Sequence, residues 1–374
     1  MDTQSPDVVI VGAGVIGLSI AWELASRGSQ VTVVDKQQPG KEASWAGAGI
    51  LPPANLESAI DPLEQLHGLS HQLHEQWAQT LLEETGIDNG FKKCGGIYVG
   101  RKVGEAAFLH GAMRALPDDG ITVASLSLND LVELEPALAP LAETGGIRCS
   151  YLLPDEYQLR NPDHLRALVA GCQARGVELI TDHEVTSIIL NEDKAVGIAT
   201  DSKEFHADNI CIAAGPWSAQ LLDQVGVTTG ILPIRGQMVM FNTQTPLLSH
   251  IVNEGSRYMV PRQDGRLLVG SCEEEVGYKK YTTPDMIHEL TEFAYEILPQ
   301  LKDHTVERTW AGLRPASFDA FPYIGHVSGF RNLFVASGHF RSGIHLSPAT
   351  AIVMTDAITE ATPSIDLSMF STLR

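Results

Sequence analysis

The glycine-rich turn near the start of the chain constrains the fold more than any other feature. An apolar run leads directly into Gly12, Gly14 and Gly17, which are spaced as G-x-G-x-x-G, and a helical stretch follows. A second apolar run then ends on Asp35. This order of strand, glycine turn, helix, strand and acidic residue is typical of a βαβ unit that binds a dinucleotide. The sequence therefore predicts an α/β fold that begins with a parallel sheet.

Each of these four residues has a physical role in such a unit. Gly12 permits the tight turn, Gly14 lets the backbone approach a pyrophosphate, and Gly17 lets the helix pack closely on the strand. The positive end of the helix dipole then faces the pyrophosphate. Asp35 can accept hydrogen bonds from the ribose hydroxyls of an adenosine. The alternative, a glycine turn of a parallel sheet that binds no ligand, stays open at this point.

A membrane span is the main rival interpretation of the first apolar segment. Residues 8–25 are nearly uncharged, and about 20 apolar residues suffice to cross a bilayer. However, Asp2 and Asp7 stand where a signal peptide would be basic. Glu23 also interrupts the run, and the turn glycines lie inside it. We therefore expect a buried strand and helix, with no export signal and no membrane span.

Composition excludes several classes of function. The net charge of −20 over 374 residues argues against nucleic-acid binding, because contacts to phosphates need clustered Lys and Arg. The five cysteines are widely spaced and odd in number, which fits neither a disulfide framework nor a metal site. They are Cys94, Cys149, Cys172, Cys211 and Cys272. We expect a cytoplasmic protein in which Cys94 and Cys211 are buried as small apolar residues.

The elements expected along the chain are of two kinds. The helices and strands of a nucleotide-binding α/β domain recur in several places, whereas short alternating strands fill 232–272. Helices are predicted at 63–85, 161–175, 284–298 and 348–360, and strands at 95–100, 177–180, 185–190, 208–217 and 333–336. A segment of small residues at 42–51 would let a ligand or another part of the chain approach its backbone.

This order of elements predicts two interleaved domains. Pieces of parallel sheet at the beginning, middle and end of the chain predict a Rossmann-like domain at 1–85, 150–225 and 315–374. A smaller antiparallel-sheet domain at 86–149 and 226–314 would hold the substrate. The fold is thus α/β in its larger part and α+β overall, and we expect the ligand between the two domains.

Three residues in the last third of the chain are candidates for binding a carboxylate. Arg314 and Arg341 lie close to glycine or proline, where the backbone is held and a side chain can be aimed. Arginine suits a buried carboxylate because its planar fork donates two parallel hydrogen bonds. Tyr258, on a predicted strand, could add a hydroxyl donor to the same carboxylate. The alternative for each arginine is an ordinary surface ion pair.

Four motifs make a family resemblance specific. They are VVIVGAGVIGLSIAWELASRG, ASWAGAGIL, GLRPASFDAFPYIG and GHFRSGIHLSP, and together they span nearly the whole chain. The chain resembles the FAD-dependent D-amino-acid oxidase family, and within it the glycine oxidases of thiamin biosynthesis. The resemblance implies an FAD-binding domain wrapped around a substrate domain, with the isoalloxazine at their junction. It also implies a homo-oligomer.

The resemblance assigns roles to individual residues of this chain. Arg314 would pair with the substrate carboxylate, Tyr258 would donate a hydrogen bond to it, and Arg341 would lie beside the flavin. The helix after Ser347 would aim its positive end at the pyrimidine edge of the flavin. The residues implied to bind FAD are Gly12, Gly14, Val15, Ile16, Gly17, Asp35, Ser44, Ala46, Gly47, Gly49, Val185, Gly215, Gly338, His339, Arg341, Ser342 and Gly343.

The sequence departs from its relatives at two places that bear on the cofactor. Asp35 stands where many relatives have glutamate, and either side chain can bind the ribose. Sarcosine oxidases tether FAD through a cysteine near the segment occupied here by 312–317, which contains no cysteine. We therefore expect noncovalent FAD.

The reaction implied is hydride transfer from the substrate α-carbon to the flavin, which gives an imino acid. Electrons would then pass to oxygen, and the substrate would be glycine, sarcosine or a small D-amino acid. No protein base is required, provided that the amine binds neutral. Two alternatives stay open: a dehydrogenase of D-amino or N-methyl amino acids with another electron acceptor, and an FAD-bound module without catalysis.

Several histidines and aromatic residues have simpler explanations. His67, His71 and His74 share a helical face, and we expect a solvated face there instead of a metal site. His345 is expected to pack under the last helix, and His339 to act through its backbone in the loop beside the flavin.

The remaining candidates are expected to be structural or peripheral. Trp217 and Trp310 adjoin glycine turns, and core packing is the expected role of both. The acidic run 273–275 is expected to be a solvated loop. Cys272 and Glu273 would lie near the substrate face.

Overall fold

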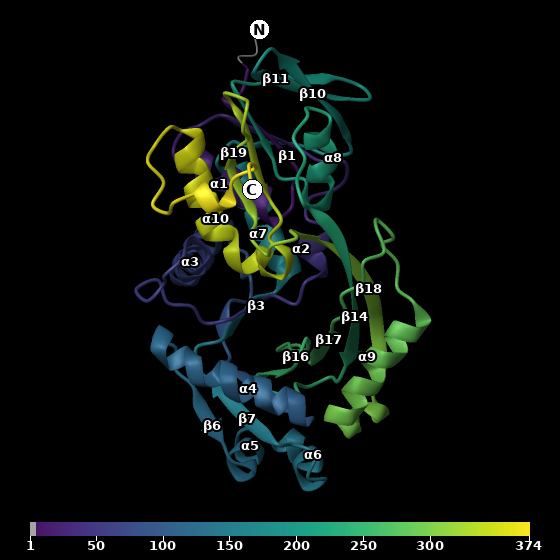
Figure 1. The fold of residues 1–374 in the computed structure, drawn as a ribbon. Helices are drawn as coiled ribbons and strands as arrows, with labels where there is room; N and C mark the ends of the chain where they lie inside the picture. Colours follow the sequence, from purple (N-terminus) through teal and green to yellow (C-terminus); the bar gives the residue numbers. More distant parts are fainter. Residues whose placement is uncertain (1–4) are drawn as a thin grey trace.

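The computed structural model describes residues 5–374, so Asp2 lies outside the described residues. Two lobes make up the molecule, one around α1, β1 and α10 and the other around α4, β7 and β16 (Figure 1). The long strands β14 (Leu232–Asn242) and β18 (Thr305–Ala316) run along one side of both. This arrangement confirms the predicted α/β fold with an interleaved antiparallel sheet. Within the described residues, no helix is long and apolar enough to cross a membrane.

A six-stranded sheet forms the centre of the first lobe. Its strands, in spatial order, are β19 (Tyr323–His326), β20 (Leu333–Ser337), β13 (Asn209–Ile212), β1 (Val8–Val11), β2 (Val31–Val34) and β9 (Glu178–Ile180). All neighbours pair in parallel except β19 and β20. The sequence Val-Val-Ile-Val of β1 is buried along its whole length, as expected of a parallel strand covered on both faces.

Helices cover one face of this sheet and a small sheet covers the other. The helices, which pack on one another in a shared apolar core, are α1 (Val15–Ser26), α3 (Pro62–Thr85), α7 (Asn161–Ala174) and α10 (Gly343–Ile358). The opposite face carries β10 (Val185–Asn191), β11 (Lys194–Thr200), β12 (Glu204–His206) and α8 (Ser218–Asp223). The two layers bury the apolar side chains on both faces of β1 and β13. This packing holds the carboxyl end of β1 in place, and the glycine turn follows directly from that end.

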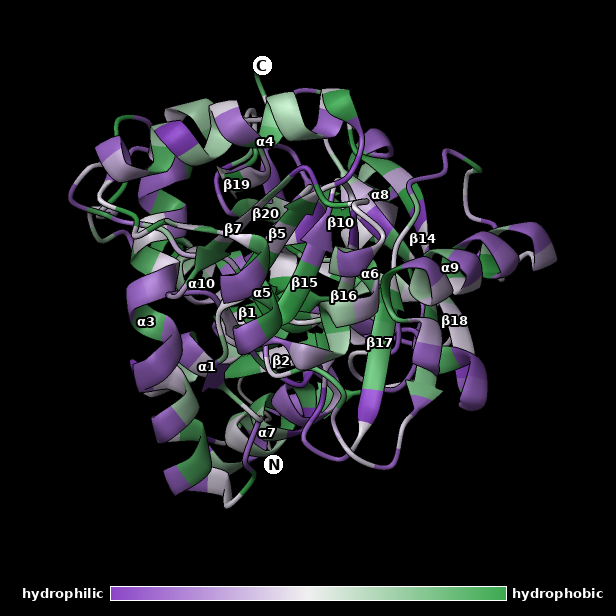
Figure 2. Cartoon of the chain, turned by 90° about the horizontal axis from the view of Figure 1, so that it is seen from below, coloured by the Kyte–Doolittle hydropathy of each residue, from purple (hydrophilic) through white to green (hydrophobic). Residues whose placement is uncertain are grey.

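An eight-stranded, mostly antiparallel sheet forms the second lobe. Its strands, in spatial order, are β18, β14, β17 (Arg266–Gly270), β16 (Arg257–Pro261), β15 (Ile251–Glu254), β5 (Gly96–Gly100), β7 (Cys149–Leu153) and β6 (Ala124–Leu126). The surrounding helices are α4 (Val103–Ala115), α5 (Leu128–Leu134), α6 (Ala139–Glu143) and α9 (Pro284–Ile297). A second apolar core lies between this sheet and α5, α6 and α9. Seen from below, the strands are mainly hydrophobic, whereas α3 and α9 alternate hydrophobic and hydrophilic residues (Figure 2).

Short elements connect the two lobes. They are α2 (Ala43–Ala46) and a small sheet of β3 (Ile50–Leu51), β8 (Tyr157–Gln158) and β4 (Lys92–Lys93). The 3-10 turns of the chain are Leu116–Asp119, Pro136–Leu138, Gly215–Trp217, Pro299–Asp303, Phe340–Ser342 and Ser368–Phe370. The predicted domain boundary at residue 150 falls inside β7, a strand of the eight-stranded sheet. Cys94 and Cys211 are buried, as predicted.

The last helix differs from the prediction in a way that affects the site. It begins at Gly343, five residues before the predicted start, and carries Pro348 in its interior. Proline has no N–H to donate to the carbonyl of Ile344, which would otherwise lack a partner there. The hydroxyl of Ser347 donates to that carbonyl instead, at 2.9 Å. The helix therefore tolerates the proline, and its N-terminus lies at Gly343.

Helices α4, α5 and α6 were absent from the prediction. Helix α4 buries only Ala106 and Met113 and exposes Val103 and Phe108, so its apolar residues give no clear helical periodicity. Its position is decided by contact with the strands of the second lobe.

Candidate functional site

Two cavities meet where the lobes join. The turn cavity, of about 370 Å³, lies against the glycine turn, the end of β2, the loop after β13 and the start of α10. The sheet cavity, of about 380 Å³, lies on the eight-stranded sheet. The residues that line both are Ala43, Gly47, Arg314, Arg341 and Ile344. A ligand in one cavity can therefore reach a ligand in the other.

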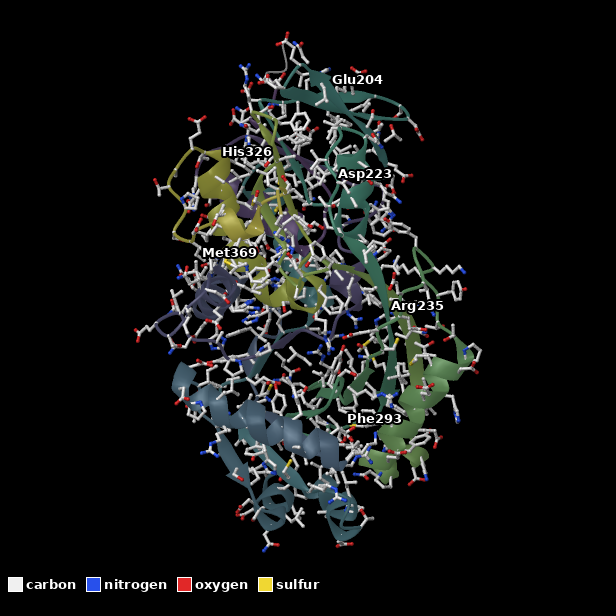
Figure 3. All side chains as sticks on the ribbon, viewed as in Figure 1. Glu204, Asp223, Arg235, Phe293, His326 and Met369 are labelled. Atoms are coloured by element: carbon white, nitrogen blue, oxygen red, sulfur yellow. The ribbon has the colours of Figure 1, made fainter. Side chains whose placement is uncertain are left out.

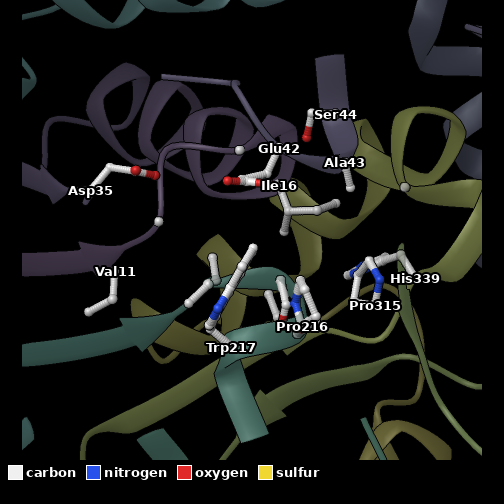
Figure 4. Close-up of a pocket in the computed structure, with 18 of the residues that line it drawn as sticks. Val11, Ile16, Asp35, Glu42, Ala43, Ser44, Pro216, Trp217, Pro315 and His339 are labelled. Carbon is white, nitrogen blue, oxygen red and sulfur yellow. Dashed lines mark hydrogen bonds between the residues drawn. The ribbon is translucent and has the colours of Figure 1, made fainter. Parts of the chain in front are cut away.

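The predicted residues divide between these cavities. The turn cavity is lined by Gly12, Gly14, Val15, Ile16, Asp35, Ser44, Gly47, Val185, Gly215, Arg314, His339, Arg341 and Gly343. The sheet cavity adds Ala46, Gly49, Tyr258 and Ser342. Gly17 and Gly338 line neither. Figure 4 shows Asp35 at one end of the turn cavity and His339 with Pro315 at the other.

The three glycines of the turn serve different purposes. Gly12 has a φ of +109°, and a methyl group there would collide with the carbonyl of Ala213. A methyl group on Gly17 would collide with the carbonyl of Gly12. By contrast, a methyl group on Gly14 would meet only the hydroxyl oxygen of Ser44, at 3.3 Å. The chain itself requires Gly12 and Gly17, whereas Gly14 leaves space toward the cavity.

The start of α1 is suited to an anion. Its first residues, Val15, Ile16 and Gly17, include no acid, so the positive end of the helix is uncompensated by its own side chains. The backbone N–H of Val15 donates to the Ser44 hydroxyl at 2.9 Å. Helix N-termini leave several backbone N–H groups without helical partners, which is the usual arrangement for binding phosphate.

Asp35 is fixed beside this helix start. Its Oδ2 accepts a hydrogen bond from the N–H of Ala13 at 2.6 Å, and its Oδ1 accepts one from the N–H of Gln37 at 2.9 Å. Burial raises the pKa of the carboxyl, while these two donors lower it. Each carboxylate oxygen has a second lone pair, so Asp35 can still accept hydrogen bonds from ligand hydroxyls.

The far wall of the turn cavity contains an aromatic residue that the sequence did not place there. Trp217 is partly exposed and lines the cavity, with the Lys36 ammonium 3.3 Å from the centre of its ring (Figure 4). The prediction that Trp217 packs in the core is therefore wrong. Its position follows from the turn at Gly215, whose φ is +56°. Val185, at the start of β10, lines the same region.

The small-residue segment is packed more tightly than predicted. A methyl group on Gly49 would collide with the carbonyl of Leu159, so the chain itself fills the space beside this glycine. The amide of Asn161 donates to the carbonyl of Ser44 at 2.7 Å. The indole of Trp310 donates to the carbonyl of Ala46 at 3.0 Å. These contacts hold the segment in place between the cavities.

One row of paired residues crosses the eight-stranded sheet under the sheet cavity. Tyr98 pairs with Asn253, and Asn253 pairs with Tyr258. Tyr258 pairs with Gly270, which in turn pairs with Met238. Paired residues point to the same face of a sheet, so the side chains of this row form the floor of the cavity. Tyr98, Asn253 and Met238 were missed because they lie on strands far apart in sequence.

Arg314 is a cation without an acidic partner. It donates from Nη1 to the carbonyl of Cys272 at 3.0 Å and from Nη2 to the Ser271 hydroxyl. Throughout residues 5–374 it makes no ion pair. The guanidinium lies over Gly236, which pairs with Gly312 two residues before Arg314. The absence of a side chain at Gly236 gives the guanidinium its place above the sheet.

Arg341 behaves differently. It forms an ion pair with Glu273 at 2.6 Å and donates to the carbonyl of Ser256, and its side chain is 35% exposed. The neighbouring Glu274 holds the buried Arg235, on the β14 side of the molecule, at 2.8 Å (Figure 3). The prediction of a plain solvated loop at 273–275 is therefore wrong for Glu274, whereas Glu273 is exposed as predicted although it pairs with Arg341. Arg314 is the better anchor for a ligand carboxylate, because its charge is uncompensated.

The predicted solvated histidine face is instead packed against α10, with His74 buried and His67 and His71 partly buried. Nδ1 of His67 lies 3.2 Å from Nδ1 of His345, and Nε2 of His74 lies within hydrogen-bonding distance, 2.8 Å, of the carbonyl of His345. Burial lowers the pKa of both His67 and His74 to about 4. The helical face was misjudged because α3 packs it against α10. Within residues 5–374, no group of side chains is arranged to hold a metal ion.

His339 is likewise buried beside the turn cavity. Its Nε2 lies 3.1 Å from the Thr350 hydroxyl, its Nδ1 has no partner among the described residues, and burial lowers its pKa to about 3. A neutral imidazole is therefore fixed in the wall near Pro315.

Comparison with known proteins agrees with this geometry. The DAO family, described as FAD dependent oxidoreductase, matches residues 7–357. A glycine oxidase of Pseudomonas aeruginosa is 35% identical over 365 residues, which cover 97% of each chain. A glycine oxidase of Geobacillus kaustophilus is 33% identical, covering 100% of this chain and 98% of that protein. The crystal structure of glycine oxidase from Geobacillus kaustophilus superposes with a TM-score of 0.92 at 32% identity, covering 100% and 99% of the two chains.

More distant structures share the fold alone. An L-proline dehydrogenase from P. horikoshii has a TM-score of 0.86 at 20% identity, covering 99% of this chain and 98% of the other. The extent of the family match and the near-complete alignment with relatives above 30% identity decide the assignment. This chain belongs to the DAO family of FAD-dependent oxidoreductases.

Proposed function

We propose that the protein oxidises glycine or another small amino acid to the imino acid, with oxygen accepting the electrons and yielding hydrogen peroxide. One observation carries this proposal: the uncompensated guanidinium of Arg314 lies in a cavity that adjoins the turn cavity. A substrate carboxylate would supply the missing negative charge. The glycine oxidase relatives make glycine the first substrate to test, followed by sarcosine and small D-amino acids.

The turn cavity fits FAD. The start of α1 would bind the pyrophosphate, Gly14 would leave room for it, and Asp35 would accept hydrogen bonds from the ribose. Bound FAD would supply an acceptor for the two electrons of the substrate. Among the residues that line either cavity there is no cysteine, which supports noncovalent binding. The start of α10 at Gly343 would direct the positive end of that helix toward the junction.

In the sheet cavity, Arg314 would bind the substrate carboxylate and Tyr258 would donate a hydrogen bond to it. Tyr258 is buried, and among the described residues its hydroxyl has only the Met238 sulfur as a neighbour in hydrogen-bonding range, at 3.5 Å. A weak sulfur partner is readily exchanged for a carboxylate oxygen. Fixing the carboxylate at one end orients the α-carbon toward the turn cavity, so the chain contributes mainly orientation and exclusion of water.

Other parts of the proposal concern organisation. We assign residues 1–85, 150–225 and 315–374 to the FAD-binding domain and 86–149 and 226–314 to the substrate domain, except that residues 150–153 of β7 go to the substrate domain. The five free cysteines support a reducing, cytoplasmic location. The resemblance to glycine oxidases of thiamin biosynthesis supports a homo-oligomer and a role in that pathway.

The visible spectrum of the purified protein, before and after anaerobic addition of glycine, tests the function. We expect an oxidised-flavin band that glycine bleaches and that returns when air is admitted with formation of hydrogen peroxide. A flavin band that no small amino acid bleaches would refute amino acid oxidation and leave a non-catalytic FAD protein. A colourless protein that cannot be reconstituted would refute FAD binding.

The same experiment separates the oxidase from the alternative dehydrogenase. A dehydrogenase would be bleached by its substrate and would stay bleached in air, turning over only with an artificial acceptor. Rapid oxygen consumption by the free enzyme would exclude that alternative.

A further inference from the structure

A buried acid lies behind the sheet cavity, at the end of the row away from Arg314. Glu156 is fully buried, and its Oε2 accepts a hydrogen bond from the Tyr98 hydroxyl at 2.5 Å. Its Oε1 accepts one from the side-chain amide of Asn253 at 3.3 Å. Tyr98 and Asn253 line the cavity, whereas Glu156 does not. The acid therefore acts on the cavity only through these two side chains.

The chain is shaped around this carboxyl group. A methyl group on Gly96 would lie 2.5 Å from the carboxyl carbon of Glu156, so the carboxyl keeps its present place only because residue 96 is glycine. The N–H groups of Cys94 and Gly95 donate to the carbonyl of Glu156 at 3.1 and 2.9 Å, which fixes its backbone.

Glu156 has no cationic partner within residues 5–374, and burial raises the pKa of its carboxyl to about 7. Burying an acid without a counter-ion costs stability, and packing alone would be served by an apolar side chain. Unlike an apolar side chain, Glu156 accepts hydrogen bonds from the two cavity residues Tyr98 and Asn253.

We infer that Glu156 is a positioning residue of the substrate cavity, which anchors Tyr98 and Asn253 and thereby limits how far a substrate can extend from Arg314. The inference rests on the proposed function, because it takes Arg314 as the carboxylate anchor. Tyr98 is the last residue of the row that forms the cavity floor, at the end away from Arg314. With its hydroxyl held, the ring stays there and closes that end of the cavity to longer side chains. Released, the ring can change rotamer and lengthen the cavity.

Binding of simple carboxylates tests this without turnover. Calorimetry on the FAD-loaded protein would compare acetate with butyrate for the wild type, Glu156→Ala, Glu156→Gln and Tyr98→Phe. We expect the affinity ratio of butyrate to acetate to rise at least fivefold in Glu156→Ala and Tyr98→Phe. Glu156→Gln can still hold both partners, because its carbonyl oxygen can accept from Asn253 while its amide N–H donates to the Tyr98 hydroxyl, and it should keep the wild-type ratio.

Glu135→Ala is the matched control. Glu135 is an equally buried acid that accepts hydrogen bonds from the N–H groups of Ser249 and His250, and it lines neither cavity. It should leave the ratio unchanged, which separates cavity positioning from general loss of stability. If Glu156→Ala does not fold, Tyr98→Phe alone decides the matter.

The outcomes distinguish this inference from the function beneath it. Suppose that Arg314→Ala loses acetate binding but that Glu156→Ala and Tyr98→Phe leave the butyrate-to-acetate ratio unchanged. This result would overturn only the positioning role of Glu156. Acetate binding unaffected by Arg314→Ala would overturn the proposed carboxylate anchor, and the inference with it.

Discussion

The substitution Gly236→Ala tests how the sheet creates the carboxylate site. Gly236 lies under the guanidinium of Arg314, and a methyl group there would come within 2.5 Å of its central carbon. Real methyl carbons do not approach so closely, so the guanidinium must move, which a long flexible side chain can do. We therefore expect a folded protein that retains FAD but holds Arg314 in the wrong place.

The expected magnitude follows from the hydrogen bonds at stake. Removing one partner of a buried charged pair costs about 2–5 kcal/mol, and displacement without removal belongs at the lower end. A loss of about 2 kcal/mol corresponds to a roughly 30-fold higher KM for glycine. Steady-state kinetics with an artificial electron acceptor would measure the KM, and the flavin absorbance would report cofactor content.

Gly104→Ala provides the control for this experiment. Gly104 lies in α4, where a methyl group would meet no atom within 4 Å. It should leave the KM unchanged and stabilise the helix by about 0.5–1 kcal/mol. A KM for Gly236→Ala within twofold of the wild type, with FAD bound, would refute the argument that this glycine makes room for Arg314.

Three further predictions concern the cofactor and stability. Asp35→Ala should weaken FAD binding about 10- to 100-fold, because a charged acceptor is lost; fluorescence titration of the apoprotein would show it, and an unchanged Kd would contradict the role. Gly14→Ala should fold and bind FAD weakly, whereas Gly17→Ala should not fold, because only the latter meets backbone; equal yields of folded protein would contradict this. Stability should fall on acidification from pH 6.5, because burial or partial burial lowers the folded-state pKa values of four histidines to about 3 or 4. They are His67, His74, His164 and His339. Because folding lowers these pKa values, the unfolded chain takes up protons first, and each histidine lowers the free energy of unfolding by about 1.4 kcal/mol per pH unit. Folding raises the pKa of Glu156, so this residue offsets the effect of one histidine. Urea unfolding at pH 7, 6 and 5 measures this, and a flat profile would refute it.

The glycine turn shows what local sequence can predict. The spacing of Gly12, Gly14 and Gly17 between two apolar runs led directly to β1, α1 and β2, and the structure has these elements within a residue or two. Their signal is local because φ values, side-chain volume at a turn and apolar periodicity depend on neighbours in the chain. The predicted start of α10 failed for the converse reason, since a contact of Ser347 compensates for Pro348.

The candidate site shows which properties local sequence cannot predict. Arg314 and Arg341 look alike in sequence, since both lie within three residues of glycine or proline. Only the fold brings Glu273 to Arg341 and leaves Arg314 without an acid. The histidine face of α3 carries polar residues, yet docking against α10 buries it. Burial and ion pairing depend on which distant segments meet.

The sequence by itself determined the βαβ unit, the positions where a side chain is forbidden, the acid after β2 and the kinds of residue available to bind a carboxylate. The tertiary structure decided which arginine keeps a free charge, and it assembled the cavity floor from Tyr98, Asn253, Tyr258 and Met238. The physical reason is that backbone conformation and apolar periodicity are set by residues a few positions apart. A cavity and its electrostatics are set by contacts between segments that local sequence does not relate, such as Tyr98 with Asn253 and Glu273 with Arg341.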